Sequence, residues 1–576
     1  MSGSRRAFLR ATASAAAGAA TAAGAATKAR AATKTAASTG SPSSWLPILR
    51  PPDRVFAFTE AERLALEPSA GGGWAGRGVH VETPLSGNGL TVRLASEPPL
   101  RRVHLRWTVP VPESLRVLGD HWERGYGDLE WRGLVPERSL PWYFLTHDGR
   151  RTHGYGVRTA ARSLAHWQLD ADGVSLWLDL RAGGRGVELS GRVLDAASVV
   201  ARQGREAESA FAAAGAFCRL LCDAPRLPRA PVYGGNSWYS AYDRIDADVV
   251  RAMADDVAAL SPAGANRPFA VIDSGWQASI GIHAAAGGPW REANRVFPDM
   301  GRMAEDLRGR GTRPGIWLRP LVTVDRVPDS WTLPASRFKG DFPGVVLDPS
   351  VPDVLALVKS DVARMSAEWK YELVKHDFTT YDLFGRWGFE MGASVTPDGW
   401  GFADRSRTSA EIVRSLYQAI RDAAGPALLI GCNTIGHLGA GLFELQRTGD
   451  DTSGREWERT RKMGVNTIAF RMPQHGAFFA ADADCAAITR AVPWPLARQW
   501  LDLVAASGTP LFLSHARDAL GPEQRKAARA ALAVAAAGQA NAEPLDWLGT
   551  TCPRRWRIGA RETAFDWTGR AGVDVP

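Results

Sequence analysis

The chain has 576 residues, of which 45% are hydrophobic and 23% charged, a globular composition too long for a single hydrophobic core and unlike that of a disordered protein. Its net charge of +8 includes five basic residues and no acidic residue within residues 1–31, so the rest of the chain carries only +3. Because basic residues do not cluster elsewhere, the charge gives no support for a nucleic-acid partner.

The first 31 residues have the order of features of an export signal. Residues 4–10 read Ser-Arg-Arg-Ala-Phe-Leu-Arg and resemble the twin-arginine motif, a weakly apolar run of Ala and Gly covers 11–26, and Ala-Arg-Ala at 29–31 would serve as a cleavage site. We therefore expect a twin-arginine signal peptide over 1–31 and a mature protein at the periplasm, cell surface or outside the cell. The alternative is a disordered alanine-rich tail.

No run outside the signal approaches 18 apolar residues, so we expect no stable membrane span in the mature protein. Residues 32–44 consist of Ala, Thr, Ser, Gly and Pro with one Lys, a composition typical of a linker. Cys218 and Cys222 have no second Cys or His pair at zinc-ligand spacing, so we expect no zinc site. Buried, reduced thiols are the expected state of most of the five cysteines.

Residues 45–228 contain short runs in which apolar and polar residues alternate, separated by turns with Gly or Pro. This pattern is typical of an antiparallel β-sandwich. The runs are Val79–Glu82, Leu90–Leu94, Val103–Val109, Gly154–Val157, Val174–Leu180 and Val187–Gly191.

Residues 229–540 follow a different pattern, in which short apolar runs of about 4–6 residues alternate with longer helical stretches. The runs begin at Val232, Phe269, Gly315, Glu372, Leu428, Phe443, Thr467 and Pro510. The helical candidates between them are Asp248–Ala259, Pro352–Glu368, Ala410–Ala423 and Gln524–Ala537. Eight strands with intervening helices predict a (β/α)8 TIM barrel with its active site at the carboxyl ends of the strands. A doubly wound open sheet is the alternative, but no glycine-rich phosphate fingerprint follows any strand. Residues 541–576 hold two strand-like pieces and predict a short C-terminal β segment.

Acidic residues follow several of the predicted barrel strands. Asp273 follows the second strand, Asp377 the fourth, and Asp450 and Asp451 the sixth, while Cys432 ends the fifth. A single Asp at such a place is often a helix N-cap, but carboxylates gathered at one rim cost desolvation and repulsion, so folding alone rarely explains them. Two opposed carboxylates are the minimum equipment for cleaving a glycosidic bond.

Four segments carry a family resemblance. Lys375-His-Asp377 resembles a nucleophile motif, Arg447-Thr-Gly-Asp-Asp451 resembles an acid/base motif, Gly315–Pro320 is similar to a Trp-bearing third strand, and Asp482–Cys485 is similar to an Asp-Pro-Asp-Cys segment without its Pro. Together they resemble the retaining α-galactosidases and α-N-acetylgalactosaminidases of glycoside hydrolase families 27 and 36, with the layout of family 36. The resemblance implies that Asp377 is the nucleophile, that Asp451 is the general acid/base, and that no metal or organic cofactor takes part.

The resemblance also implies roles in substrate binding. Lys375 would hydrogen-bond sugar hydroxyls, and its charge would keep Asp377 ionised. Arg447 would hold the 2-position side of the sugar, and Trp238 and Trp276 would help to form the wall of the pocket. Cys432 matches a cysteine whose neighbourhood limits the substituent at carbon 2.

One position departs from the family pattern. Family members carry two adjacent Asp residues after the second strand, which grip the 4- and 6-hydroxyls of galactose, whereas this chain has Asp273 followed by Ser274. A hydroxyl accepts hydrogen bonds more weakly than a carboxylate, so the sugar preference stays open.

The sequence thus predicts an exported retaining exo-α-glycosidase of the α-galactosidase type, with a carbohydrate substrate as its partner. One alternative keeps the barrel with another sugar preference: an α-N-acetylgalactosaminidase, a β-L-arabinopyranosidase or a transglycosylase similar to raffinose synthases. The other is a carbohydrate-binding protein whose catalytic function has decayed.

Overall fold

The structure, a computed structural model, describes residues 44–568 except 88, 280–286, 340, 341, 343 and 539–541. The predicted signal peptide over 1–31 and the predicted linker, apart from Ser44, therefore lie outside the described residues. From Ser43 onward the chain forms one compact unit. Within the described ranges no helix has the length and apolar character needed to cross a membrane.

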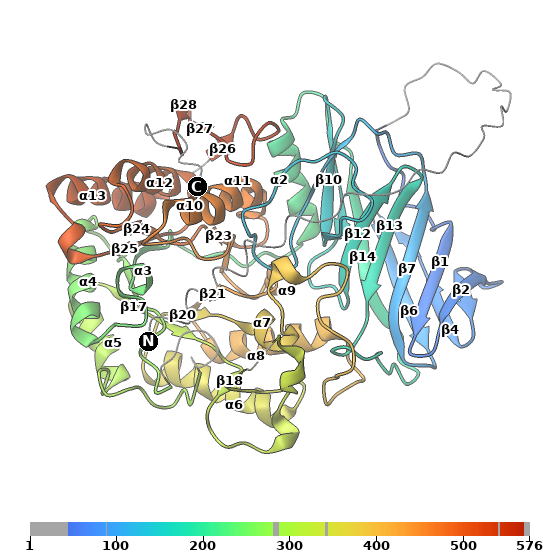
Figure 1. Ribbon diagram of the computed structural model, residues 1–576, viewed down its shortest axis with the longest axis horizontal. Helices are drawn as coiled ribbons and strands as arrows, with labels where there is room; N and C mark the ends of the chain where they lie inside the picture. Colours follow the sequence, from blue (N-terminus) through green and yellow to red (C-terminus); the bar gives the residue numbers. More distant parts are fainter. Residues whose placement is uncertain are drawn as a thin grey trace, which may run out of the picture. The chain divides into compact units, whose positions relative to one another are not determined.

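The first part of this unit is antiparallel β structure (Figure 1). Its strands pair in the order β8-β10-β11-β14-β6-β4-β3-β2-β1-β7-β13-β12-β9, and β5 pairs with β6. Their bounds are β1 (Arg54–Thr59), β2 (Arg63–Pro68), β3 (Trp74–Gly76), β4 (Val79–Glu82), β5 (Leu85–Ser86), β6 (Gly89–Ser96), β7 (Leu100–Thr108), β8 (Arg116–Gly119), β9 (Leu140–Pro141), β10 (Tyr143–His147), β11 (Thr152–Val157), β12 (Leu164–Asp170), β13 (Gly173–Asp179) and β14 (Leu194–Arg202).

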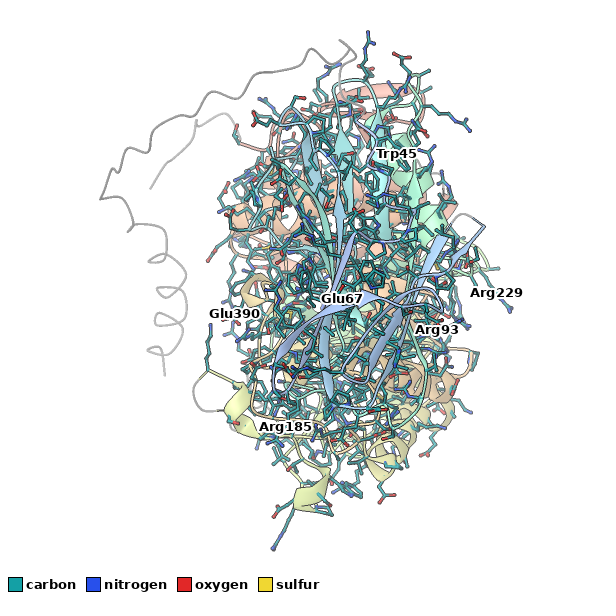
Figure 2. The ribbon with its side chains drawn as sticks, turned by 90° about the vertical axis from the view of Figure 1, so that its right-hand side faces the viewer. Trp45, Glu67, Arg93, Arg185, Arg229 and Glu390 are labelled. Atoms are coloured by element: carbon teal, nitrogen blue, oxygen red, sulfur yellow. The ribbon has the colours of Figure 1, made fainter. Side chains whose placement is uncertain are left out.

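These strands form a sandwich. Phe144 on β10 and Trp167 on β12 are far apart in the pairing order, yet their ring centroids are 5.5 Å apart in the shared core. Outward positions are charged: Glu67 is exposed on β2, and Arg93 on β6 pairs with Asp195 (Figure 2). This alternation of buried and exposed residues is the signal that the sequence carried.

Five of the six predicted sandwich runs are strands, but Val187–Gly191 is not, and that prediction is wrong. Val187 forms a single bridge with Leu100. The next residue, Glu188, donates its N–H to the carbonyl of Arg405 in the barrel, so its backbone is used at the contact with the barrel instead of in a sheet. The helix α2 (Ala210–Leu221) follows β14.

The second part of the unit is the barrel (Figure 1). Its parallel strands pair in the order β23-β22-β21-β20-β17-β16-β15-β25-β24. Three residues, 483–485, join the first and last strands of this order, so the sheet curls until its two ends meet, which excludes a doubly wound open sheet. The bounds are β15 (Tyr233–Asn236), β16 (Phe269–Ile272), β17 (Arg313–Leu318), β20 (Leu373–His376), β21 (Leu428–Gly431), β22 (Leu445–Arg447), β23 (Ala480–Asp482), β24 (Ala486–Ile488) and β25 (Leu511–His515).

Seven of the eight predicted barrel strands are present, and the prediction at Thr467–Phe470 is wrong. Those residues lie in the helix α11 (Thr467–Arg471), the last part of a continuous helical stretch that begins at Trp457. A short apolar run fits a buried helix as well as a buried strand, and all four of these residues are buried. The alanine-rich strands β23 and β24, which lack long apolar runs, occupy this place in the sheet.

The predicted helices are confirmed. They are α4 (Ala247–Leu260), α6 (Pro352–Ala363) with its π-helical continuation Arg364–Glu368, α8 (Ser409–Ala424) and α13 (Pro522–Ala537). Further helices are α3 (Trp238–Ala241), α5 (Met300–Gly309), α7 (Thr379–Phe384), α9 (Gly436–Gly439), α10 (Trp457–Thr460) and α12 (Trp494–Ser507). Thr408 and Glu411 form a capping box that fixes where α8 begins.

The C-terminal segment forms a three-stranded antiparallel sheet of β26 (Ala542–Pro544), β27 (Arg555–Ile558) and β28 (Arg561–Ala564). It packs against both larger parts of the unit. Trp547 contacts Trp131 of the sandwich at 5.5 Å between ring centroids, and the carbonyl of Trp567 accepts from Nε1 of Trp457 at 2.7 Å.

Candidate active site

The residues that the sequence singled out lie at the carboxyl ends of five strands of the barrel sheet. Trp238 follows β15, Asp273 and Trp276 follow β16, Lys375 and Asp377 lie on and directly after β20, Cys432 follows β21, and Arg447 ends β22 with Asp451 four residues later. Parallel strands deliver the ends of all five to one rim of the barrel.

Asp377 is held by three hydrogen bonds. Its Oδ2 accepts from Nε1 of Trp317 at 3.1 Å, and its Oδ1 accepts from the backbone N–H groups of Phe378 at 2.7 Å and Asn433 at 3.1 Å. Burial alone raises the pKa of this carboxyl, but the charges of Lys375 and Arg124 and the Trp317 hydrogen bond outweigh it, so the pKa of Asp377 lies below its usual value. Asp377 is therefore a fixed, ionised carboxylate.

Lys375 lies two residues before Asp377 and points to Asp273. Its Nζ donates to Oδ2 of Asp273 at 2.7 Å, and the same oxygen accepts from Nδ2 of Asn236 at 2.8 Å. Burial opposes the lysine charge, but Asp273 and the other acidic groups around it raise the pKa of Lys375 well above its usual value. The ion pair of Lys375 with Asp273 thus connects the ends of β16 and β20.

Asp451 lies on the loop after β22, with 36% of its side chain exposed. Its Oδ1 accepts from Nη2 of Arg447 at 3.3 Å and is 3.9 Å from Nη1 of Arg124. Burial raises the pKa of Asp451, but the charges of Arg447, Arg124 and Lys375 outweigh it and lower this pKa. In the free protein Asp451 is therefore a carboxylate that must take up a proton before it can act as an acid.

Arg447 and Cys432 lie together behind Asp451. Nη1 of Arg447 donates to Sγ of Cys432 at 3.3 Å, and its Nη2 is 2.9 Å from Oδ2 of Asp484. Burial raises the pKa of the Cys432 thiol well above its usual value, so the thiol stays neutral. Asp484 belongs to the predicted Asp482–Cys485 segment, which joins β23 to β24 and anchors Arg447.

Ser274 stands where the family pattern has a second carboxylate. Its Oγ accepts from Nε2 of Gln277 at 3.1 Å, and its N–H donates to Oδ1 of Asp273 at 2.9 Å. The hydroxyl is therefore bonded within its own loop.

No family model and no curated protein matches the sequence. The structure, in contrast, resembles solved α-galactosidases. The α-galactosidase TtGalA from Thermus thermophilus, in complex with p-nitrophenyl α-D-galactopyranoside, has a TM-score of 0.58 at 21% identity, covering 89% of this chain and 99% of that one. A variant of the GH36 α-galactosidase AgaA from Geobacillus stearothermophilus, in complex with 1-deoxygalactonojirimycin, has a TM-score of 0.53 at 14% identity, covering 82% of this chain and 68% of that one. The galactosidase domain of the α-galactosidase–sucrose kinase AgaSK has a TM-score of 0.52 at 16% identity, covering 79% and 65%.

The chain has a GH36-like α-galactosidase fold. The predicted fold, an N-terminal β-sandwich followed by a barrel, is thereby confirmed.

Within this GH36-like fold, one predicted wall residue has a different position. Trp276 has no exposed surface, and its Nε1 donates to the carbonyl of Trp317 at 3.0 Å. It is therefore fully buried and supports Trp317, whose own Nε1 donates to Asp377. Trp238 is partly exposed, and its ring centroid is 5.4 Å from that of Tyr242.

Two charged residues beside the side chains at the strand ends come from the sandwich and were missed by the sequence analysis. Glu123 and Arg124 lie on the loop between β8 and β9, and both side chains are buried. The alternation of apolar and polar residues that marks the strands is absent from this loop. No sequence period therefore indicates that the loop contacts the barrel. The signal that could have revealed them is the pair of adjacent charged residues, Glu123 and Arg124, between Trp122 and Gly125-Tyr126.

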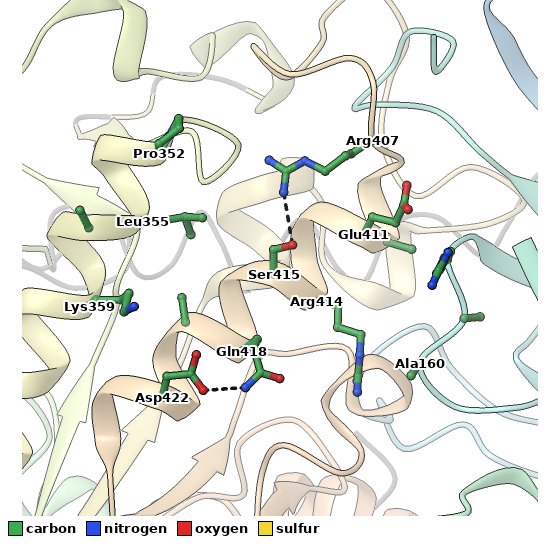
Figure 3. A pocket seen from close by; sticks show the side chains of 15 residues that line it. Ala160, Pro352, Leu355, Lys359, Arg407, Glu411, Arg414, Ser415, Gln418 and Asp422 are labelled. Carbon is green, nitrogen blue, oxygen red and sulfur yellow. Dashed lines mark hydrogen bonds between the residues drawn. The ribbon is translucent and has the colours of Figure 1, made fainter. Parts of the chain in front are cut away.

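The described residues contain no group of three His, Cys, Asp or Glu side chains that could hold a metal ion. A groove of about 960 Å³ between α6 and α8 lies apart from the strand ends and contains none of the predicted site residues (Figure 3). Its polar groups pair with one another: Arg407 donates to Ser415 at 3.3 Å, and Gln418 donates to Asp422 at 2.7 Å.

Proposed function

We propose that this protein is a retaining exo-α-glycosidase that hydrolyses terminal α-galactosides through a covalent glycosyl-enzyme. The observation that carries the proposal is the contrast between the two carboxylates. Asp377 is buried and fixed by three donors, whereas Asp451 is partly exposed on a loop at the same rim. A nucleophile needs the first environment, and a group that exchanges protons with leaving group and water needs the second.

In the first step, Oδ of Asp377 attacks the anomeric carbon while protonated Asp451 gives its proton to the departing glycosidic oxygen. In the second step, Asp451 takes a proton from water, and the resulting hydroxyl displaces Asp377 from the sugar. Two displacements restore the original anomeric configuration. Because the cations around Asp451 lower its pKa, we expect kcat/KM to rise as the pH is lowered.

The choice of α-galactosides has its support in the solved structures with this fold. TtGalA is described in complex with p-nitrophenyl α-D-galactopyranoside and with stachyose. Lys375 and Asp273, hydrogen-bonded to each other at the rim, offer a donor and an acceptor for sugar hydroxyls.

Ser274 favours a second candidate in which the barrel takes a related sugar. The resemblance assigns the pair of adjacent carboxylates, of which Ser274 replaces one, to the 4- and 6-hydroxyls of galactose. A β-L-arabinopyranoside has the ring of galactose without its 6-hydroxymethyl group. Since the Ser274 hydroxyl already accepts from Gln277, it offers less to a 6-hydroxyl than a carboxylate would. An α-N-acetylgalactosaminidase, a transglycosylase and a non-catalytic carbohydrate-binding protein are the remaining alternatives.

An assay with p-nitrophenyl glycosides tests the proposal. The panel contains α-D-galactopyranoside, N-acetyl-α-D-galactosaminide, β-L-arabinopyranoside and α-D-glucopyranoside. We expect the highest kcat/KM on the α-galactoside and, by proton NMR, the α-anomer as the first product. Preference for the pentoside would select the second candidate, and binding without release of nitrophenol would identify a decayed enzyme.

We also propose that the protein is exported by the twin-arginine route. The support is the order of the Arg5-Arg6 motif, the weakly apolar run and the Ala29–Ala31 site in the sequence.

A further inference from the structure

The loop of the sandwich between β8 and β9 enters the rim of the barrel. The N–H of Gly125 donates to the carbonyl of Thr448 at 2.8 Å, and the carbonyl of Gly125 accepts from the N–H of Asp450 at 2.9 Å. This bridge pairs the sandwich loop with the loop after β22, which carries Asp451. A Cβ atom at Gly125 would lie 3.0 Å from Cγ2 of Thr467, a contact so tight that Thr467 would have to shift slightly, so the close approach favours glycine here.

The bridge places Arg124 against the acidic side of the site. Nη2 of Arg124 is 2.8 Å from Oδ1 of Asp450, and its Nη1 is 3.9 Å from Oδ1 of Asp451 and 3.8 Å from Sγ of Cys432. The guanidinium carbon lies 5.6 Å from the ring centroid of Trp387. The aromatic contact and the Asp450 ion pair together hold the cation in one place.

The residue before it, Glu123, contacts the nucleophile side. Its Oε2 accepts from Nδ2 of Asn433, and its Oε1 accepts from the N–H of Gly388 at 2.9 Å and from the hydroxyl of Tyr126. The N–H of the same Asn433 donates to Oδ1 of Asp377 at 3.1 Å. A single residue, Asn433, therefore connects Glu123 of the sandwich, through its side-chain amide, with Asp377 of the barrel, through its backbone N–H.

We propose that Glu123 and Arg124 are positioning residues of the catalytic site: Glu123 fixes Asp377 through Asn433, and Arg124 fixes Asp451 together with Arg447. The inference rests on the proposed function for the roles of the two carboxylates. It means that the sandwich is part of the catalytic apparatus, because the loop supports residues that hold both carboxylates.

The burial of Glu123 and Arg124 indicates that they do more than join the sandwich to the barrel. Glu123 is 2% and Arg124 is 5% exposed, and the two charges are not hydrogen-bonded to each other, since Nε of Arg124 is 4.0 Å from Oε2 of Glu123. Two buried charges that only joined the domains would gain most by pairing directly. Here Glu123 accepts from Asn433, which contacts Asp377, whereas Arg124 pairs with Asp450 and lies 3.9 Å from Asp451. The ion pair of Arg192 with Glu411, at 2.9 Å, already joins sandwich and barrel away from the strand ends.

Charged and titratable groups from several elements surround Asp451, so Arg124 is one of several groups that set its pKa. They are Arg447 on β22, Lys375 and Asp377 at β20, Arg459 on α10, Tyr239 on α3, Asp450 on the same loop and Asp484 between β23 and β24. The cations lower the pKa of Asp451. Removing Arg124 therefore raises this pKa, and the alkaline limb of the kcat/KM profile moves to higher pH.

The test uses Arg124→Met, Arg124→Lys and Glu123→Gln, with Arg192→Met as the matched control. Methionine keeps the packing on Trp387 and removes the charge. Lysine keeps the charge and serves as the second variant if Arg124→Met does not fold. We expect Arg124→Met to lower kcat at least roughly ten-fold and to shift the alkaline limb upward, because a misplaced catalytic group is costly. Glu123→Gln should lower kcat similarly without that shift. Arg192→Met should change neither quantity.

Crystal structures of the variants give a second measurement that does not need activity. We expect displacement of the Asp451 carboxylate in Arg124→Met and of Asn433 and Asp377 in Glu123→Gln. Unmoved carboxylates, with kcat within about two-fold of the parent, would overturn the inference. If the parent hydrolyses no glycoside, the proposed function fails, and the carboxylate positions alone then decide whether the loop holds them.

Discussion

Trp317 donates its indole N–H to Oδ2 of Asp377 at 3.1 Å, and its carbonyl accepts from the indole of Trp276 at 3.0 Å. Two tryptophans on neighbouring strands thus form a chain that ends on the carboxylate. These hydrogen bonds orient the carboxylate of Asp377, with Oδ2 toward Trp317 and Oδ1 toward the N–H of Asn433.

The first prediction concerns this chain. Trp317→Phe keeps the ring packing but removes a donor to an ionised carboxylate, a bond whose loss costs about 1.5–3 kcal/mol. We expect kcat/KM to fall about ten-fold or more, measured with a nitrophenyl glycoside. Trp290→Phe is the matched control, because Trp290 packs on Trp317 at 5.7 Å and its Nε1 has no hydrogen-bond partner among the described residues. Equal losses in both variants would show that packing, not the hydrogen bond, matters.

The second prediction concerns sugar preference. Ser274→Asp adds a carboxylate acceptor beside Asp273, and a charge-assisted hydrogen bond is stronger than a neutral one. We expect activity on α-galactosides to rise relative to the parent and relative to Ser274→Asn, which has similar size without the charge. A fall on every sugar of the panel would mean that the loop after β16 is shaped for a different substrate.

The sequence predicted the elements of this fold whose residues follow a recognisable pattern. Helices such as Ala410–Ala423 carry a strong period, strands such as Phe269–Ile272 are apolar runs that alternate with helical stretches, and Asp377 and Asp451 carry motif spacings. It failed at Thr467–Phe470, where a short apolar run fits either structure. It also missed Glu123 and Arg124, because the contact between a sandwich loop and the barrel rim depends on tertiary packing and leaves no local period.

The third prediction concerns acid stability. His166 is buried, neither ring nitrogen has a hydrogen-bond partner among the described residues, and burial lowers its pKa to about 3. Since the unfolded chain binds this proton near pH 6.5, the unfolded state holds more protons between pH 6.5 and about 3, and stability falls as the pH falls through that range. Between pH 7 and pH 5 this one residue accounts for about 2 kcal/mol.

We therefore expect His166→Phe to lose less stability than the parent on going from pH 7 to pH 5, as measured by urea unfolding. His80→Phe is the control, because His80 is exposed on β4. An unchanged pH dependence in His166→Phe would show that the imidazole is protonated in the folded protein.

The fourth prediction concerns export. Replacing both Arg5 and Arg6 with Lys should retain the precursor in the cytoplasm, since the twin-arginine route requires the arginine pair. We expect the exported form of the parent to begin near Ala32, after the Ala29–Ala31 site, as determined by N-terminal sequencing. Because lysine keeps both positive charges, the change tests the arginine pair itself and not the net charge of the segment. Export that is unaffected by the change at Arg5 and Arg6 would rule out this route.

The fifth prediction concerns the catalytic pair. Asp377→Ala removes the group that forms the glycosyl-enzyme, so activity on all substrates should be lost, and added azide should restore turnover with inverted stereochemistry. Asp451→Ala removes protonation of the leaving group, so substrates with an acidic phenol should keep more of their first-step rate than natural α-galactosides. Stopped-flow release of nitrophenol measures that rate.

Asp450 is the internal control for this assignment. It precedes Asp451, but its carboxylate lies between Arg124 at 2.8 Å and Arg459 at 2.7 Å, an arrangement that fixes an anion in place and suits a structural ion pair better than proton transfer. Asp450→Ala should therefore lower activity less than Asp451→Ala on natural substrates and should show no dependence on the acidity of the leaving group. An inactive Asp450→Ala beside a nearly normal Asp451→Ala would shift the acid/base by one residue, and Arg447, four residues before Asp451, would then lose its place in the motif.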